Sequence, residues 1–348
     1  MLERGPAAAA AAASPLLVVE NLAKRFPVRG GLFTGVKAAV HAVDGVSFVL
    51  HPGETLGIVG ESGCGKSTLA RMMVRLIEPS AGVIRFRGVE LSTLSARAMR
   101  GYRKDIQFIF QDPYASLNPR LRVGAIVGEA IENFEAVRGR ELAGRVADLF
   151  ARVGLRPAHM RNYPHEFSGG QRQRLGIARA LSLNPSIIVA DEPVSALDVS
   201  VQAQVINLMI DLQAEFNLAY LFIAHDLAVV QHISHRVAVM YLGRIVELGS
   251  RRVLFSHPLH PYTEALLDSV PVPDPAQRRE KDVLAGEVPS PTRPPPGCRF
   301  HTRCPLAEPR CRVEAPAMVE AEPGHFVACH VRAPAGRARE PFVNEGTP

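Results

Sequence analysis

Short apolar runs alternate with amphipathic stretches along roughly the first 255 residues of the chain. Apolar runs of strand length occur at 55–59, 106–110, 187–190 and 218–224. Residues Leu142, Val146, Leu149, Phe150 and Val153 fall on one helical face that ends near Gly154, and 201–216 also predicts a helix. Strands that alternate with helices indicate an α/β fold with a largely parallel sheet.

Other segments have the pattern of antiparallel strands. Short strands are predicted at Val18–Val19, Ala39–Val43 and Val46–Leu50, with an inserted loop around Gly30-Gly31. The runs 237–241 and 244–248 flank a Leu-Gly turn and predict a hairpin. Residues 271–297 are rich in proline and indicate an extended linker, and a small cysteine-bearing segment follows.

The segment between the first apolar strand and a predicted helix at 69–77 contains the most informative motif. It fits G-x-x-x-x-G-K-[ST] and contains Gly60, Glu61, Ser62, Gly63, Cys64, Gly65, Lys66, Ser67 and Thr68. The glycines let backbone N–H groups point at phosphate oxygens, and the helix adds the positive end of its dipole. Lys66 can reach the β- and γ-phosphates, and the Ser67 hydroxyl can ligate Mg²⁺. A chance glycine-rich turn is the alternative, and further motifs downstream argue against it.

Polar residues follow several other apolar runs. Asp191 and Glu192 end a predicted strand, where they could bind Mg²⁺ and polarise a water, or simply cap the strand end. The run 167–171, Phe-Ser-Gly-Gly-Gln, precedes a helix predicted to start near Arg172, so it is either an anion-binding surface or an ordinary N-cap at Ser168. Three further polar segments are candidates. Gln111 and His225 each end an apolar run, and the run 195–198 closely follows Glu192. Each is a weak signal alone.

Composition limits the class of protein. The chain has 348 residues, 47% of them hydrophobic, and no run approaches the roughly 18 apolar residues of a membrane-spanning helix. The alanine-rich start, broken by Pro6, indicates a disordered tail rather than a signal peptide. The net charge of +6 fits nucleic acid or a membrane-embedded partner. The positive charge is spread along the chain and Trp is absent, which argues against nucleic acid.

Taken in this order, the motifs resemble the nucleotide-binding subunit of ATP-binding cassette (ABC) transporters over roughly residues 16–255. The resemblance implies a P-loop NTPase fold of the ABC type, with a RecA-like core, an antiparallel β subdomain and an α-helical subdomain near 112–183. It implies ATP and Mg²⁺ as cofactors. Lys66 and the loop amides would bind the phosphates, and Ser67 and Gln111 would reach Mg²⁺ with support from Asp191.

The same resemblance assigns the remaining site residues. Glu192 would be the general base for water, and His225 would contact the γ-phosphate. Phe26 would stack on adenine, although the loop at 30–39 lengthens the usual spacing. The site of a facing subunit would be completed by Ser168, Gly169, Gly170 and Gln171, and Phe167 replaces the leucine typical of this signature.

Three features narrow the resemblance to the ATPase subunits of oligopeptide and dipeptide importers. These are the run 111–119, the run 257–263 (His-Pro-Leu-His-Pro-Tyr-Thr) and the cysteine tail. Among the subunits of these importers, the chain most resembles the F-type ATPase. The implied partners are two transmembrane permease subunits, a second ABC ATPase and an external substrate-binding protein. The segment after Gln111 would face a permease, and the chain would sit peripherally on the cytoplasmic side of the cytoplasmic membrane.

The predicted organisation is a disordered tail at 1–14, an ATPase domain at 15–255, a C-terminal extension at 256–335 and a tail at 336–348. Peptides are the implied cargo, and nickel or another small solute stays open. A soluble ABC ATPase that acts on DNA or the ribosome would carry tandem cassettes or long insertions, which this chain lacks. A third reading is a metal- or redox-sensing regulator in which the tail is the functional part.

Four cysteines gather in the tail, at Cys298, Cys304, Cys311 and Cys329, with spacings of x5, x6 and x17. Clustered thiols in a cytosolic chain favour metal over disulfides. The spacing differs from a paired C-x2-C ribbon, so the residues leave Zn²⁺ and an iron–sulfur cluster open. The resemblance to the importer family favours a [4Fe–4S] cluster, and Zn²⁺ and unligated or redox-active thiols are the alternatives. The fifth cysteine, Cys64, is predicted to be a small filler in the phosphate loop.

Overall fold

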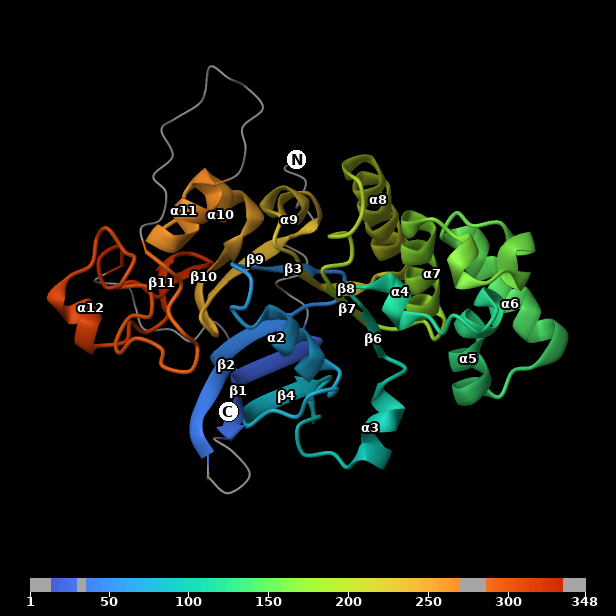
Figure 1. Cartoon of the computed structure of the whole chain (residues 1–348), viewed down its shortest axis with the longest axis horizontal. Coiled ribbons are helices and arrows are strands. Elements are labelled where there is room, and N and C mark those ends of the chain that lie inside the picture. Colours follow the sequence, from blue (N-terminus) through green and yellow to red (C-terminus); the bar gives the residue numbers. More distant parts are fainter. Residues whose placement is uncertain (1–13, 30–35, 270–285, 334–348) are drawn as a thin grey trace, which may run out of the picture. The chain divides into compact units, whose positions relative to one another are not determined.

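The computed structural model describes residues 14–29, 36–269 and 286–333, and these form two compact units. The helical unit contains His51–Thr55 and Thr93–Ala224. The β unit contains Ser14–Leu50, Leu56–Ser92 and the described residues from His225 onward. Figure 1 labels the elements of both units. The predicted loop at Gly30-Gly31, the tail at 336–348, most of the tail at 1–14 and much of the linker lie outside the described residues.

The helical unit is built on parallel strands in the order β8, β7, β6. Their bounds are β6 (Ile106–Ile109), β7 (Ile187–Asp191) and β8 (Ala219–Ile223). Every residue of β7 and β8 is buried. Strands buried on both faces need continuous apolar runs rather than alternation, which is why these strands were visible in the sequence. The predicted parallel strands of this unit are confirmed.

The helices of this unit are labelled in Figure 1. They are α3 (Ala96–Tyr102), α4 (Pro113–Ser116), α5 (Val123–Glu135), α6 (Gly139–Arg152), α7 (Gly169–Leu181) and α8 (Val199–Phe216), with 3-10 turns at Pro157–Arg161 and Pro164–Glu166. Helices α5, α6 and α7 contact one another, and α7 contacts β6. Helix α6 buries Val146 and Phe150, and Gly154 follows it with a φ of 71°, so the predicted helical face and its end are confirmed.

The β unit contains a four-stranded antiparallel sheet in the order β2-β1-β4-β5. Its strands are β1 (Leu17–Arg29), β2 (Val36–Leu50), β4 (Ala81–Phe86) and β5 (Val89–Glu90). The short strands predicted from the sequence are therefore parts of two long ones. Asn21 and Gly45 have positive φ and lie at shifts in the β1–β2 register. These residues mark bulges inside continuous strands rather than turns between short ones.

A second sheet of the β unit runs in the order β11-β12-β10-β9-β3. Its strands are β3 (Thr55–Val59), β9 (Arg236–Tyr241), β10 (Arg244–Ser250), β11 (Val319–Glu322) and β12 (His325–Val327). Strand β3 is parallel to β9, and β9 and β10 form the predicted hairpin. Strand β12 pairs with β10, so the segment after the linker continues the same sheet.

The helices of the β unit are short. They are α2 (Lys66–Met73), α9 (Leu227–Ile233), α10 (Arg251–Ser256), α11 (Pro261–Asp268) and α12 (Pro309–Val313). Helix α2 starts three residues before the predicted helix because the phosphate-loop motif itself supplies its first turn. Within the residues that the structure describes, no helix meets the length and hydropathy of a membrane span.

Candidate functional site

The loop between β3 and α2 has a backbone path that only glycine allows. Gly60, Gly63 and Gly65 have φ angles of 152°, 78° and 108°. A Cβ on Gly60 would lie 2.1 Å from the carbonyl oxygen of Met240, and one on Gly65 would lie 1.9 Å from that of Ala42. The loop is thus held tightly against backbone from two neighbouring strands. This is the curled, amide-rich geometry that binds phosphate.

Lys66 is the first residue of α2, and only 4% of its surface is exposed. Its Nζ donates hydrogen bonds to the carbonyl oxygens of Gly60 at 2.7 Å and Glu61 at 3.0 Å. The ammonium therefore lies inside the curl of the loop. Buried Cys64 fills the space beside Gly60, and burial raises the pKa of its thiol, as expected for a packing residue.

Glu61 has partners that sequence reasoning missed. Its backbone N–H donates to Tyr262 Oη at 2.9 Å. Its carboxylate accepts hydrogen bonds from both Nη atoms of Arg303, at 2.9 and 3.1 Å. These partners lie 201 and 242 positions along the chain, and no local pattern indicates contacts of that range.

In the helical unit, buried Asp191 is the last residue of β7, and Glu192 follows the strand. Glu192 has a φ of 47°, which is unusual for a residue with a side chain. Its Oε2 accepts a hydrogen bond of 2.9 Å from Gln111 Nε2, at the end of neighbouring β6. Two of the residues predicted from separate strand ends are thus brought together. Strained backbone of this kind clusters at functional sites.

The signature run 167–171 forms the start of α7. Ser168 Oγ accepts from the N–H of Gln171 at 3.4 Å, and Gln171 Oε1 accepts from the N–H of Ser168 at 3.0 Å. This capping box starts the helix at Gly169 rather than near Arg172, because the motif itself caps the helix. A Cβ on Gly170 would lie 2.4 Å from Val201 Cγ1, so this glycine allows α7 to meet the start of α8.

The remaining predicted site residues occupy surface positions. Phe26 on β1 is 36% exposed, and Lys24 Nζ lies 5.1 Å from its ring centroid. His225 is exposed and lies two residues before α9. Ser195 donates from its hydroxyl to the Glu192 carbonyl oxygen at 3.1 Å, which supports the loop after β7.

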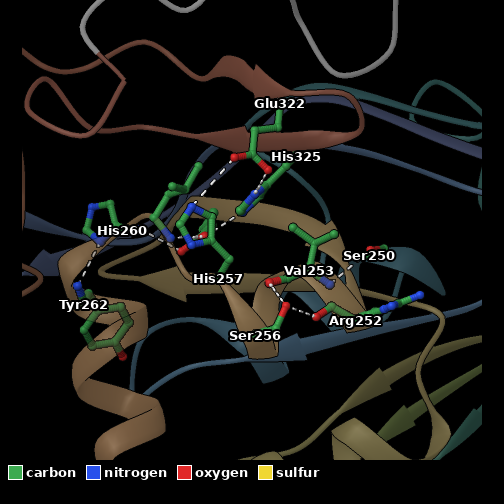
Figure 2. Close-up of polar contacts among 11 residues, drawn as sticks. Ser250, Arg252, Val253, Ser256, His257, His260, Tyr262, Glu322 and His325 are labelled. Atoms are coloured by element: carbon green, nitrogen blue, oxygen red, sulfur yellow. Dashed lines mark hydrogen bonds and ion pairs between the residues drawn. The ribbon is translucent and has the colours of Figure 1, made fainter.

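The run 257–263 leads into α11 (Figure 2). His260 Nδ1 accepts the N–H of Tyr262 at 3.1 Å and so caps the helix. The buried carboxylate of Glu247 accepts the N–H groups of Leu259 at 2.7 Å and His260 at 3.0 Å. His325 Nε2 lies 2.7 Å from the same carboxylate. The motif therefore fixes the start of α11 through polar groups removed from solvent.

This buried cluster predicts that the chain loses stability in mild acid. Burial lowers the pKa of His260 to about 4. Burial acts to raise the pKa of Glu247, but hydrogen bonds from His325 and the Leu259 N–H hold it below its usual value. The unfolded chain binds protons at both residues at higher pH than the folded chain, so acid favours unfolding. For His260 alone, we expect a loss of about 2 kcal/mol at pH 5.

Urea unfolding of the full chain at pH 7.5 and pH 5 measures this effect. His260→Asn is the matched control, because Asn can cap the helix but does not titrate. The variant should show a smaller difference between the two pH values. Equal stability of the parent chain at both would contradict the prediction.

The four tail cysteines lie in the extension around α12. Cys298 donates its N–H to the carbonyl oxygen of Cys311 at 2.8 Å. Burial, together with the nearby thiols of Cys311, Cys304 and Cys329, raises the pKa of Cys298 to about 11. Within 14–29, 36–269 and 286–333, no group of three or more His, Cys, Asp or Glu side chains is arranged as a metal-ion site. The thiols are thus neighbours that do not close around a single ion.

Comparison with known proteins identifies the family. Residues 43–195 match the family described as ABC transporter, and 246–311 match the oligopeptide/dipeptide transporter C-terminal region. The oligopeptide transport ATP-binding protein AppF of Bacillus subtilis is 58% identical over 91% of this chain and 97% of its own. The glutathione import ATP-binding protein GsiA of Pectobacterium atrosepticum is 58% identical over 81% of this chain and 45% of its own.

Among solved structures, a dimeric post-hydrolysis state of the ATP-binding cassette MJ0796, bound to ADP and Pi, matches with a TM-score of 0.61. It shares 27% identity and covers 68% of this chain and 99% of its own. The fold predicted from the sequence is confirmed. The chain belongs to the ABC transporter family, among the ATP-binding subunits of its oligopeptide and dipeptide branch.

Proposed function

We propose that this chain binds and hydrolyses ATP as one subunit of a membrane transporter that imports peptides. The observation that carries the proposal is the glycine-enforced phosphate loop, with buried Lys66 inside its curl, in the same unit as the oligopeptide-transporter extension. The match over 246–311 favours peptides over nickel or another small solute as cargo.

Each candidate residue has a role in this proposal. Lys66 and the loop amides hold the β- and γ-phosphates. Ser67, Gln111 and Asp191 supply the oxygen donors that Mg²⁺ prefers, and the ion neutralises charge on the phosphates. Glu192 accepts a proton from the attacking water, His225 contacts the γ-phosphate, and Phe26 stacks on adenine. The hydrogen bond from Gln111 to Glu192 supports this assignment, because the residue proposed to reach Mg²⁺ lies beside the residue proposed as the base.

The signature residues would contact ATP that is bound by a second ATPase subunit. Ser168, Gly169, Gly170 and Gln171 form the N-terminal turn of α7, where the helix dipole favours negative charge. In the proposed assembly this turn faces the γ-phosphate of ATP held by the partner. Neither subunit then holds a complete site, so hydrolysis depends on closure of the dimer.

The segment after Gln111 is the proposed contact with a permease subunit. Tyr114 and Leu121 in this segment are 53% and 40% exposed. Large apolar side chains in a connecting segment suit a protein partner. The proposed division places the ATPase at 15–255 and the extension at 256–335, with the whole chain peripheral to the cytoplasmic side of the membrane.

The test is a tagged pull-down from detergent-solubilised native membranes, with mass spectrometry of the partners. Two permease subunits, a second ATPase and an external binding protein are the expected partners. Nucleic acid or ribosomal proteins in their place would support a soluble ABC ATPase and contradict the transporter. A nickel-binding protein among the partners would overturn the peptide cargo.

We further propose that the tail cysteines hold a [4Fe–4S] cluster. Four neighbouring thiols fit its donor set, and the cluster would crosslink the segments of the extension. A single Zn²⁺ needs four sulfurs at about 2.3 Å from one point. The thiols leave Zn²⁺ open as the alternative, and the resemblance to the importer family favours the cluster.

Replacing Cys298 with serine is expected to remove the bound metal and leave ATP binding intact, because a cluster that loses one of four thiolate ligands is destabilised. The measurement is iron, zinc and sulfide content per chain after anaerobic purification, beside the affinity for a fluorescent ATP analogue. Cys64→Ser is the matched control for metal content, since Cys64 lies in the phosphate loop. Unchanged metal content in Cys298→Ser would contradict the cluster.

A further inference from the structure

An ion pair between Arg303 and Glu61 connects the C-terminal extension to the phosphate loop. The Arg303 side chain is 6% exposed, and both of its Nη atoms bind the Glu61 carboxylate. This bidentate geometry fixes the relative orientation of the two side chains as well as their distance.

The second contact with Glu61 comes from α11. Tyr262 is fully buried, and its hydroxyl accepts the Glu61 N–H. This N–H is therefore already paired within the protein. Between them, Arg303 and Tyr262 hold the side chain and the backbone of one residue, at the second position of the phosphate-loop motif.

Both contact residues are themselves held in place. The Tyr262 ring packs against Tyr241 and Phe300, with centroids 4.6 and 5.4 Å apart. The N–H of Arg303 donates to the carbonyl oxygen of Phe300 at 2.9 Å. The His260 cap fixes the start of α11, from which Tyr262 projects (Figure 2).

A second set of hydrogen bonds connects the extension to the phosphate loop at Cys64. Arg299 is 8% exposed at its side chain and donates to the carbonyl oxygen of Leu242 and to Asp44. The next residue, Gly243, donates its N–H to the carbonyl oxygen of Cys64 at 2.8 Å. The extension thus supports the loop directly at Glu61 and indirectly at Cys64.

We propose that Arg303 and Tyr262 are positioning residues of the ATP site, through which the C-terminal extension sets the conformation of the phosphate loop. The inference rests on the proposed function of that loop. Neither residue contacts the nucleotide in this account. Each acts on ATP binding through Glu61, so its loss affects the KM for ATP more than the kcat.

The experiment compares Arg303→Met and Tyr262→Phe with the parent in the full chain, assembled with its transporter partners. Both substitutions keep side-chain bulk and remove the groups that contact Glu61, and Arg303→Met also removes a hydrogen bond with Tyr241. We expect each to raise the KM for ATP by about tenfold, with little change in kcat. The control is Arg310→Gln, which removes an exposed ion pair with Glu314 in the same extension and should leave the KM unchanged.

A double variant tests whether Arg303 acts through Glu61. If it does, Arg303→Met combined with Glu61→Gln should weaken ATP binding no more than the larger single effect. Parent-like KM values in both Arg303→Met and Tyr262→Phe would overturn the proposal, as would an equal change in Arg310→Gln. A parent complex that shows no ATP binding would contradict the proposed function of the site instead.

Discussion

Replacing Glu192 with glutamine is expected to stop ATP hydrolysis while leaving ATP binding intact. Glutamine keeps the size of the side chain and its hydrogen bond with Gln111, but it cannot accept a proton from the attacking water. A general base contributes about 10²–10⁴-fold to a rate, so turnover should fall by this factor. Because ATP still binds but is not consumed, the two ATPase subunits should accumulate in the closed state.

The measurement is phosphate release by the assembled transporter, beside the fraction of cross-linked ATPase dimer in the presence of ATP. Glu215→Gln is the matched control, since it removes an exposed carboxylate of the same unit that pairs with Arg152. The control should hydrolyse ATP at the parent rate. Full turnover by Glu192→Gln in the assembled complex would refute the role of Glu192.

Replacing Gly65 with alanine is expected to abolish ATP binding. The new Cβ would lie 1.9 Å from the Ala42 carbonyl oxygen, and the φ of 108° is one that side-chain-bearing residues rarely adopt. The neighbour is backbone of a long strand, so the loop must move instead. A loop displaced by even 1 Å misdirects the amides that hold phosphate, and we expect affinity for ATP to fall by about 100-fold or more.

Gly88→Ala separates the steric clash from general backbone strain. Gly88 has a φ of 79° in the turn between β4 and β5, and its added Cβ would meet open space. This variant should lose some stability and bind a fluorescent ATP analogue like the parent. Near-parent affinity in Gly65→Ala would contradict the account of the loop.

Local sequence predicted those parts of the fold and site that depend on neighbouring residues. The strand, glycine loop and helix around Lys66 form one local unit, so the motif could be recognised at once. The strand that ends in Asp191 is buried along its whole length, so its apolar run could be recognised in the sequence. The hairpin at 236–250 was visible because a Leu-Gly turn separates two strand-length runs.

Features that depend on distant residues could not be predicted in this way. The pair of Glu61 and Arg303 joins positions 242 residues apart, and either residue alone looks like an ordinary surface charge. The strands β1 and β2 were predicted as shorter pieces because Asn and Gly occur in both turns and bulges. Only the pairing of β1 with β2 shows that Asn21 and Gly45 lie at bulges. The cysteine spacing likewise fixes the number of thiols but not their arrangement in space.

The measurement that tests the central claim most directly is peptide uptake by proteoliposomes that contain the purified complex, with ATP enclosed on the side of the ATPase subunits. The account predicts that uptake of labelled peptide requires ATP and the external binding protein, and that Glu192→Gln abolishes it. Uptake that proceeds equally without ATP, or that persists unchanged in Glu192→Gln, would contradict the account.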